Sequence, residues 1–165
     1  MTKQGITIYY LEICGRDALI PKFCNDPLFR IEECLVKQPP LNRFLYEYIG
    51  TQWSWKDRLS FAEQQWEACI RNPQLKTWIA FYAGSIAGYY ELVKTDSRSV
   101  EIHYLGLAPD FIGRGFGGPL LTHAIQSGFA WEANRLWVHT CTQDHQNALT
   151  NYTARGMKLY KTEDK

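Results

Sequence analysis

Residues 107–121 read LAPDFIGRGFGGPLL and are the most informative stretch of the chain. Four glycines lie within six consecutive positions of it: Gly113, Gly115, Gly117 and Gly118. Glycine leaves the backbone open to an approaching anion, and the N-terminus of a helix offers unpaired N–H groups with a positive dipole. Arg114 adds a positive charge, and Pro119 suits a first helical turn. The stretch therefore predicts a strand-to-helix loop that binds a phosphate group.

Two classes of phosphate ligand fit these glycines. Gly113, Gly115 and Gly118 satisfy the GxGxxG pattern of dinucleotide-binding domains. That pattern normally opens a domain at its first strand, and an acidic residue follows about 20 positions later. Here several predicted strands come first, only 47 residues follow Gly118, and residues 136–138 are Leu-Trp-Val. An NAD(P)-dependent oxidoreductase is therefore the weaker interpretation.

Hydrophobic periodicity extends the prediction outward from the loop. Strands are expected at 6–13, 77–82, 86–93, 100–108, 136–141 and 157–161, and helices at 42–49, 119–133 and 146–154. Ser60 and Glu63 resemble a capping box, which predicts a further helix that ends at Asn72-Pro73. The proline-containing segment 14–40 is expected to form loops. This order predicts one α/β (α+β) domain over residues 1–165, a mixed sheet flanked by helices.

Composition excludes several classes of protein. The 18 basic and 17 acidic residues leave a net charge of +1, whereas non-specific nucleic-acid binding needs a basic excess. The five cysteines are scattered without a CxxC pair, and the spacing of His139, Cys141 and His145 fits no zinc site. A secretory signal and an apolar run of about 20 residues are both absent from the sequence. We expect a cytoplasmic protein with no metal, membrane or nucleic-acid partner.

Two motifs give the chain a resemblance to the GCN5-related N-acetyltransferase (GNAT) family. Residues 112–117, IGRGFG, match the acetyl-CoA signature Gln/Arg-x-x-Gly-x-Gly/Ala, except that Ile112 stands where Gln or Arg is usual. Residues 144–149, DHQNAL, together with Tyr152 and Gly156-Met157, are similar to a second motif in which Asn, Ala, Tyr and Gly-Phe recur. The resemblance covers roughly residues 77–161. It implies a single GNAT-type domain with a mixed, mostly antiparallel sheet.

The resemblance also implies roles for individual residues. Acetyl-CoA would be the co-substrate, and the acceptor would be an amine of a small molecule or a peptide. The backbone of Leu105 and Leu107, together with Asn147, would hold the pantetheine, and an N–H near Leu107 would polarise the thioester carbonyl. The pyrophosphate would lie on the loop formed by Ile112, Gly113, Arg114, Gly115, Phe116, Gly117 and Gly118. Tyr152 would bind the cofactor and donate a proton to the leaving thiolate, although its spacing from Ala148 and Leu149 equally suits a core position.

Two side chains on the preceding strand are candidates for the base that deprotonates the amine. Strand alternation is expected to place Glu101, His103 and Leu105 on one face. Glu101 lies eleven residues before Ile112, the position of a catalytic glutamate in some relatives. Histidine is well suited to base work near neutral pH. Either residue could act directly or through water, and a polar strand face beneath a loop is the alternative for both.

The acceptor remains open at this level. An aromatic cluster is expected to form the acceptor wall or to fill the core: Phe44, Tyr46, Tyr48, Trp53 and Trp55. A catalytically silent acyl-CoA-binding module is the second hypothesis, since Ile112 departs from the signature. The oligomeric state, including a homodimer, is also left open.

Overall fold

A computed structural model describes residues 5–165 of the chain, so residues 1–4 of the predicted domain lie outside the description. Within these residues, seven strands form one sheet in the order β2-β3-β4-β5-β6-β1-β7, in which only β5 and β6 pair in parallel. The strands are β1 (Thr7–Cys14), β2 (Phe29–Glu33), β3 (Leu75–Tyr82), β4 (Ser85–Lys94), β5 (Ser99–Leu107), β6 (Arg135–Cys141) and β7 (Lys158–Asp164). The helices are α1 (Pro39–Gly50), α2 (Glu63–Arg71), α3 (Gly117–Ala130) and α4 (Ala148–Ala154), with 3-10 turns η1 (Arg16–Ala18), η2 (Thr51–Trp53) and η3 (Pro109–Phe111). The predicted mixed, mostly antiparallel α/β fold is confirmed.

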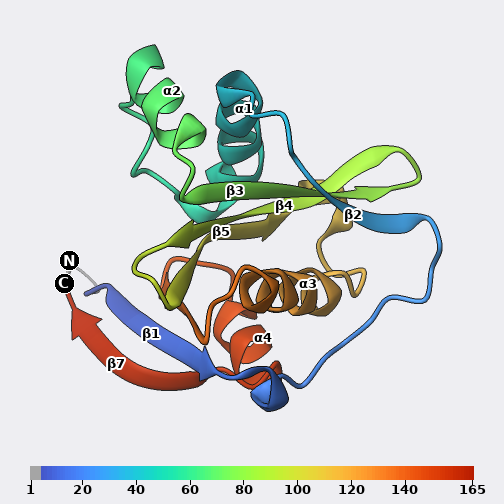
Figure 1. Cartoon of the computed structure of the whole chain (residues 1–165), viewed down its shortest axis with the longest axis vertical. Helices are drawn as coiled ribbons and strands as arrows, with labels where there is room; N and C mark the ends of the chain where they lie inside the picture. The colour runs from blue at the N-terminus through green and yellow to red at the C-terminus, as the bar shows by residue number, and fades with distance from the viewer. Residues whose placement is uncertain (1–4) are drawn as a thin grey trace.

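The helices cover the sheet from both sides. Helices α1 and α2 stand on one face of β3, β4 and β5, whereas α3 and α4 lie on the other face (Figure 1). The apolar face of α3, with Leu120, Leu121 and Ile125 completely buried, packs against β4, β5 and β6. No helix among residues 5–165 has both the length and the apolar character needed to cross a membrane.

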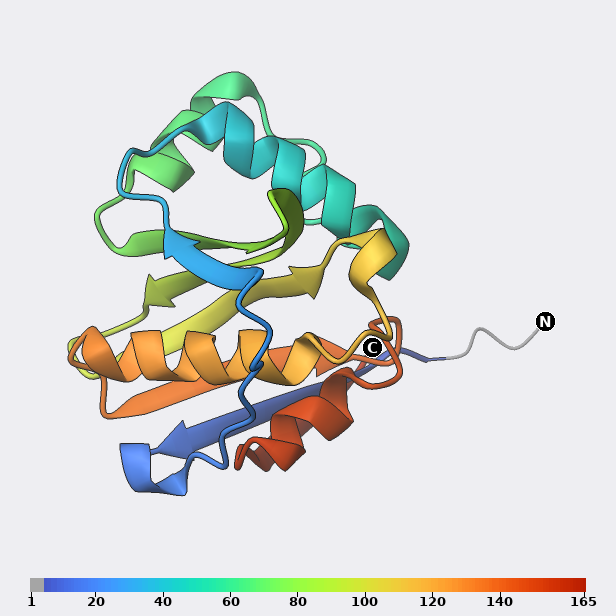
Figure 2. The same cartoon turned by 90° about the vertical axis from the view of Figure 1, so that its right-hand side faces the viewer.

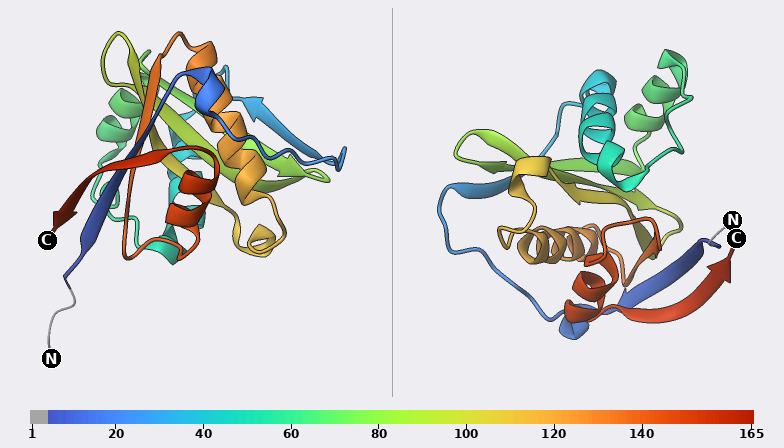
Figure 3. Two further views of the ribbon diagram at one scale, coloured as in Figure 1. Left: turned by 90° about the horizontal axis from the view of Figure 1, so that it is seen from below. Right: turned by 180° about the vertical axis from the view of Figure 1, so that it is seen from behind.

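The first strand completes the far end of the sheet. β1 lies between β6 and β7 and pairs antiparallel with both. Ile6 and Lys165 exchange two backbone hydrogen bonds of 2.9 and 2.8 Å, so the described ends of the chain lie side by side (Figure 3). The connection from β1 to β2 crosses α3 (Figure 2), and the Lys22 N–H donates to Thr122 Oγ1 at 2.9 Å.

Two predictions about local structure were wrong. β2 was expected to be loop, yet Phe29 and Ile31 alternate with exposed Arg30 and pair with β3, so the strand follows a short period-two pattern. The predicted capping box at Ser60 does not start α2. The helix begins at Glu63, because a backbone turn ends just before it. At its start the Ala62 N–H donates to Gln65 Oε1 at 2.7 Å.

Other boundaries differ by a few residues. α1 begins at Pro39 rather than Asn42, because two successive prolines fit a first turn whose N–H groups have no intrahelical partner. For the same reason α3 begins at Gly117, with Pro119 in its first turn.

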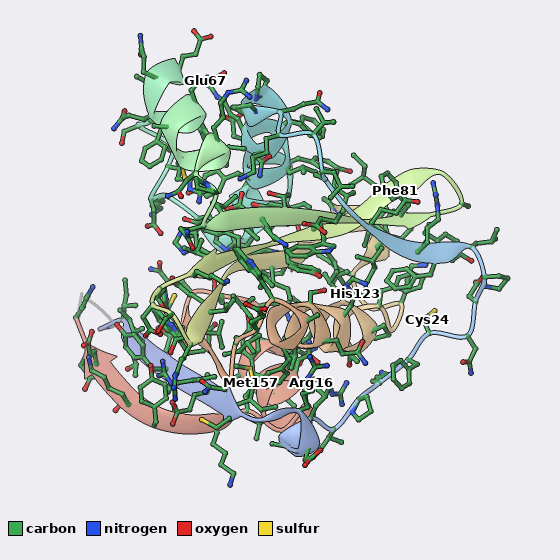
Figure 4. All side chains as sticks on the ribbon, viewed as in Figure 1. Arg16, Cys24, Glu67, Phe81, His123 and Met157 are labelled. Atoms are coloured by element: carbon green, nitrogen blue, oxygen red, sulfur yellow. The ribbon has the colours of Figure 1, made fainter. Side chains whose placement is uncertain are left out.

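A half-buried histidine beneath the sheet makes stability depend on pH. His123 lies on α3 (Figure 4), and its Nδ1 is 2.8 Å from the hydroxyl of Tyr90 on β4. Burial lowers the pKa of His123. A histidine with a lowered folded-state pKa stabilises the fold fully above its unfolded pKa of about 6.5 and loses that contribution as pH falls. We expect the free energy of unfolding, measured with urea, to fall from pH 7 to pH 5, and less steeply in His123→Asn. Equal slopes for the two proteins would contradict this assignment.

Candidate functional site

Strands β5 and β6 separate toward their carboxyl ends. Their parallel pairing covers only Ser99–Glu101 against Arg135–Trp137, although β5 continues to Leu107 and β6 to Cys141. Figure 2 shows the two strands meeting at one end and diverging at the other. The divergence leaves one backbone edge of β5 without a partner strand in the middle of the sheet.

The open edge carries the backbone groups of Leu105 and Leu107. The Ala108 N–H donates to the Ala87 carbonyl at 2.8 Å. In an antiparallel ladder the hydrogen-bonding direction alternates along the strand, so Gly106 also points toward β4. The N–H and C=O groups of Leu105 and Leu107 therefore point into the gap between β5 and β6.

The glycine loop lies directly beyond this edge. Gly113 and Gly115 have φ angles of 78° and 86°, in the left-handed region that favours glycine, and a Cβ at either would meet no atom within 4 Å. Within residues 5–165, no N–H of residues 113–116 has a hydrogen-bond acceptor. Gly117 and Gly118 add the unpaired N–H groups of the first turn of α3. The loop is an open backbone surface with up to six donors.

Aromatic side chains pack against the glycine loop. Phe116 is buried and stacks on Phe29 of β2, with ring centroids 4.8 Å apart. The Arg114 guanidinium lies over the rings of Tyr82 and Phe111 at 5.1 and 5.0 Å. A positive charge is thus held beside the donors. The strand that the sequence analysis missed provides part of this support.

Gly118, Gly117 and Ile112 of the predicted loop are more closely surrounded than Gly113 and Gly115. A Cβ on Gly118 would lie 2.4 Å from Arg155 Nη1 and 2.6 Å from Lys22 Cδ, so this glycine makes room for two cationic side chains at the start of α3. A Cβ on Gly117 would make ordinary contacts with Asn151 and Leu107. Ile112 is half-buried and ends η3 in an extended conformation.

The structure brings Glu101 together with two histidines. Glu101 is 7% exposed, and its Oε1 lies 3.2 Å from His103 Nδ1 and 3.7 Å from His139 Nε2. His139 comes from β6, so the cluster bridges the two strands near the point where they separate. Nothing in the sequence shows which β6 residue faces Glu101, so His139 was considered there only as a metal ligand and was rejected.

The predicted alternation along β5 is wrong at one point. The register between β4 and β5 shifts so that Tyr104 pairs with Glu91 and Ile102 with Leu92, which leaves His103 as an extra residue. The His103 and Tyr104 rings are consequently in contact, with centroids 4.6 Å apart. Leu105 thus falls on the opposite face from Glu101 and His103.

A second buried carboxylate on the same sheet is already paired. Glu91 on β4 is completely buried, and one of its oxygens lies 2.9 Å from Arg58 Nη1. Asn42 Nδ2 donates to the other oxygen at 2.9 Å. Because it is enclosed by these partners, Glu91 holds the segment after α1 against the sheet.

Tyr152 lies in α4, the helix that follows β6. It is 7% exposed, and burial, aided by the charge of Asp144, raises the pKa of its phenol well above the usual value of about 10. The phenol is therefore protonated throughout the neutral range. Asp144 is fixed by hydrogen bonds from the Thr140 hydroxyl and the Cys141 N–H.

Asn147 and Asn151 have different surroundings at α4. Asn147 is exposed at the start of the helix. The Asn151 amide donates to the Gly117 carbonyl at 3.1 Å and so ties α4 to the glycine loop. No group of three or more His, Cys, Asp or Glu side chains in the described part of the chain is placed to hold a metal ion.

The predicted aromatic cluster divides in the structure. Tyr46 is buried, whereas Phe44 and Tyr48 are exposed and stack on each other. Trp53 of η2 meets His145 of the β6–α4 loop, with ring centroids 4.7 Å apart. Trp55 lies between Tyr46 and Tyr104. Only the two tryptophans lie toward the open end of β5 and β6.

A splayed parallel strand pair that leads into a glycine-rich helix start defines the fold and site of the acetyltransferase (GNAT) family. The model of that family matches residues 41–157, and the chain belongs to it.

Known proteins agree with this assignment. An uncharacterized N-acetyltransferase from Mycobacterium bovis is 30% identical over 93 residues, which are 56% of this chain and 59% of the relative's length. The crystal structure of a GCN5-related N-acetyltransferase from Sphaerobacter thermophilus superposes with a TM-score of 0.72 at 14% identity, covering 96% of this chain and 50% of that one. The crystal structure of an aminoglycoside acetyltransferase from an uncultured soil metagenomic sample superposes with a TM-score of 0.64 at 16% identity, covering 79% of this chain and 88% of that one.

Proposed function

We propose that the protein transfers the acetyl group of acetyl-CoA to the primary amine of a small molecule or peptide. The observation that carries the proposal is the unpaired backbone of Leu105 and Leu107 in line with the open glycine loop. One elongated ligand with amides at one end and a pyrophosphate at the other matches that sequence of donors.

Backbone groups do most of the binding of the co-substrate. The pyrophosphate lies on the N–H groups of residues 113–118, where the dipole of α3 and the charge of Arg114 favour an anion. The pantetheine amides pair with the open edge of β5 as an additional strand would, and Asn147 contacts them from α4. Ile112 contributes only its backbone, so its departure from the signature leaves the donors in place.

The reaction is a direct attack on the thioester. Glu101 accepts a proton from the ammonium of the acceptor, and His103 and His139 orient its carboxylate. The free amine forms a bond to the carbonyl carbon, and a β5 N–H near Leu107 stabilises the negative oxygen. The carbon–sulfur bond then breaks as Tyr152 protonates the thiolate. The nitrogen releases its second proton to solvent, Tyr152 regains a proton from solvent, and the neutral amide and CoA leave.

Tyr152→Phe tests the proton donor. The change removes only the hydroxyl, so we expect binding of acetyl-CoA to be retained and kcat to fall by about 10²-fold, the lower end of general acid catalysis. Tyr160→Phe makes the same change on the exposed strand β7 and should leave kcat unchanged. An unchanged kcat in Tyr152→Phe would show that the phenol has only a packing role.

A panel of amines distinguishes an enzyme from a silent acyl-CoA-binding module. Amino acids, polyamines, peptides, aromatic amines and aminoglycosides would be assayed for CoA thiol release and for an acetylated product by mass spectrometry. Aminoglycosides are included because one similar structure is named for that activity. The proposal predicts equimolar thiol and amide with at least one amine class. Binding of acetyl-CoA without transfer to any class would favour the silent module.

A further inference from the structure

On the α1 side, Ile49 and Trp55 cover β5 at Gly106, between the two open backbone positions. The indole of Trp55 spans the space between α1 and β5, and a glycine meets it at each end. A Cβ on Gly50 of α1 would lie 2.4 Å from Trp55 Cε3, and a Cβ on Gly106 would lie 3.4 Å from Trp55 Cη2. Gly50 leaves the room that the indole fills, whereas Gly106 leaves room first for Ile49 Cγ2, 2.7 Å from such a Cβ, and then for the edge of the indole.

Gly106 is the residue between the two open backbone positions. Leu105 and Leu107 direct their N–H groups into the gap, and the Leu107 side chain points toward Gly117 on the α3 side. Position 106 therefore faces α1, but glycine places no side chain on that face. An acyl group attached to a thioester on this edge would meet the far end of the Trp55 ring.

Empty space lies on the other side of the indole. A pocket of about 170 Å³ is lined by Tyr46, Glu47, Thr51, Ser54, Trp55, Lys56 and Leu59. Trp55 both lines this pocket and lies next to Gly106.

From this arrangement we propose that Trp55 sets the acyl chain length that the enzyme accepts, and that it excludes chains longer than acetyl. The inference rests on the proposed acetyl-CoA function. Truncation of the indole joins the pocket to the open edge of β5. One methylene in an apolar pocket changes discrimination by about 10-fold or more, so the effect is measurable.

The experiment measures kcat/KM by thiol release with acetyl-, propionyl-, butyryl- and hexanoyl-CoA. The proteins are wild type, Trp55→Phe, Trp55→Leu and Trp55→Ala, with acyl-CoA binding followed in parallel by thermal shift. We expect the butyryl-to-acetyl ratio to rise by at least about 10-fold from wild type to Trp55→Leu. Trp131→Ala truncates a tryptophan that packs under Lys76 and Lys94 at the end of α3, and it should keep the wild-type ratio.

The outcomes separate the two proposals. A folded Trp55→Leu or Trp55→Phe with the wild-type chain-length profile overturns the gate while acetyl-CoA use by the wild type stands. The conservative variants give this result even where Trp55→Ala does not fold. Wild-type protein that binds and uses no acyl-CoA would overturn the proposed function and the gate together.

Discussion

Gly115→Val is expected to abolish acetyl-CoA binding while the protein stays folded. Gly115 has a φ of 86°, and a β-branched residue in this conformation costs about 1–3 kcal/mol of strain. The loop would rearrange and withdraw at least two N–H donors from the pyrophosphate, each worth about 1.5–3 kcal/mol as a hydrogen bond to a charged group. At about 1.4 kcal/mol per factor of ten, Kd should rise at least about 10²-fold in isothermal titration.

Gly84→Val is the matched control for this loss. Gly84 lies in the turn between β3 and β4 with a φ of 85°, and a Cβ there also meets no atom within 4 Å. The local strain is therefore the same at both positions, and only Gly115 belongs to the loop. Equal loss of affinity in the two variants would show that global destabilisation, rather than the phosphate donors, was measured.

The second large effect is expected for Glu101→Gln. The glutamine side chain keeps the shape of the buried carboxylate but cannot accept a proton from the acceptor ammonium. We expect kcat to fall by about 10²- to 10⁴-fold, with little change in the KM for acetyl-CoA, because the contacts to the co-substrate come from the loop and the β5 backbone. Steady-state kinetics with a saturating amine measures both quantities.

Two further variants show whether Glu101 acts as the base. Glu12→Gln makes the same change in a half-buried carboxylate that pairs with Arg135 at 2.6 Å, and it should retain kcat. His103→Gln should reduce kcat by less than Glu101→Gln does, since the histidine orients the carboxylate. A larger loss in His103→Gln than in Glu101→Gln would transfer the role of base to the histidine.

The loop was predictable because its chemistry is local. Gly113 and Gly115 lie in the same short segment as the backbone N–H groups that they leave exposed, and the apolar periodicity of α3 begins directly after them. The strands from β3 to β6 were likewise predictable from the short apolar runs within each segment, although the alternation expected along β5 fails at its bulge. β2 was missed because its five residues follow a long connection rich in proline, where the turn signals outweighed a short alternation.

The candidate catalytic cluster was only half predictable. Glu101 and His103 lie on one strand, and a spacing rule finds them together. His139 reaches Glu101 only through the parallel pairing of β5 with β6, and the contact between His103 and Tyr104 depends on a bulge. The position of Trp55 between Gly50 and Gly106 likewise depends on packing between elements, which no local pattern specifies.

Binding of the co-substrate tests the account most directly. Thermal denaturation of the wild-type protein would be followed with acetyl-CoA, CoA, NADH or NADPH, each in large excess. A ligand at 100 times its Kd stabilises the folded state by about 2.7 kcal/mol, which is readily measured as a shift in Tm. We predict such a shift with acetyl-CoA and CoA and none with either nicotinamide dinucleotide. A shift with NADPH alone would contradict the assignment of the loop to acetyl-CoA.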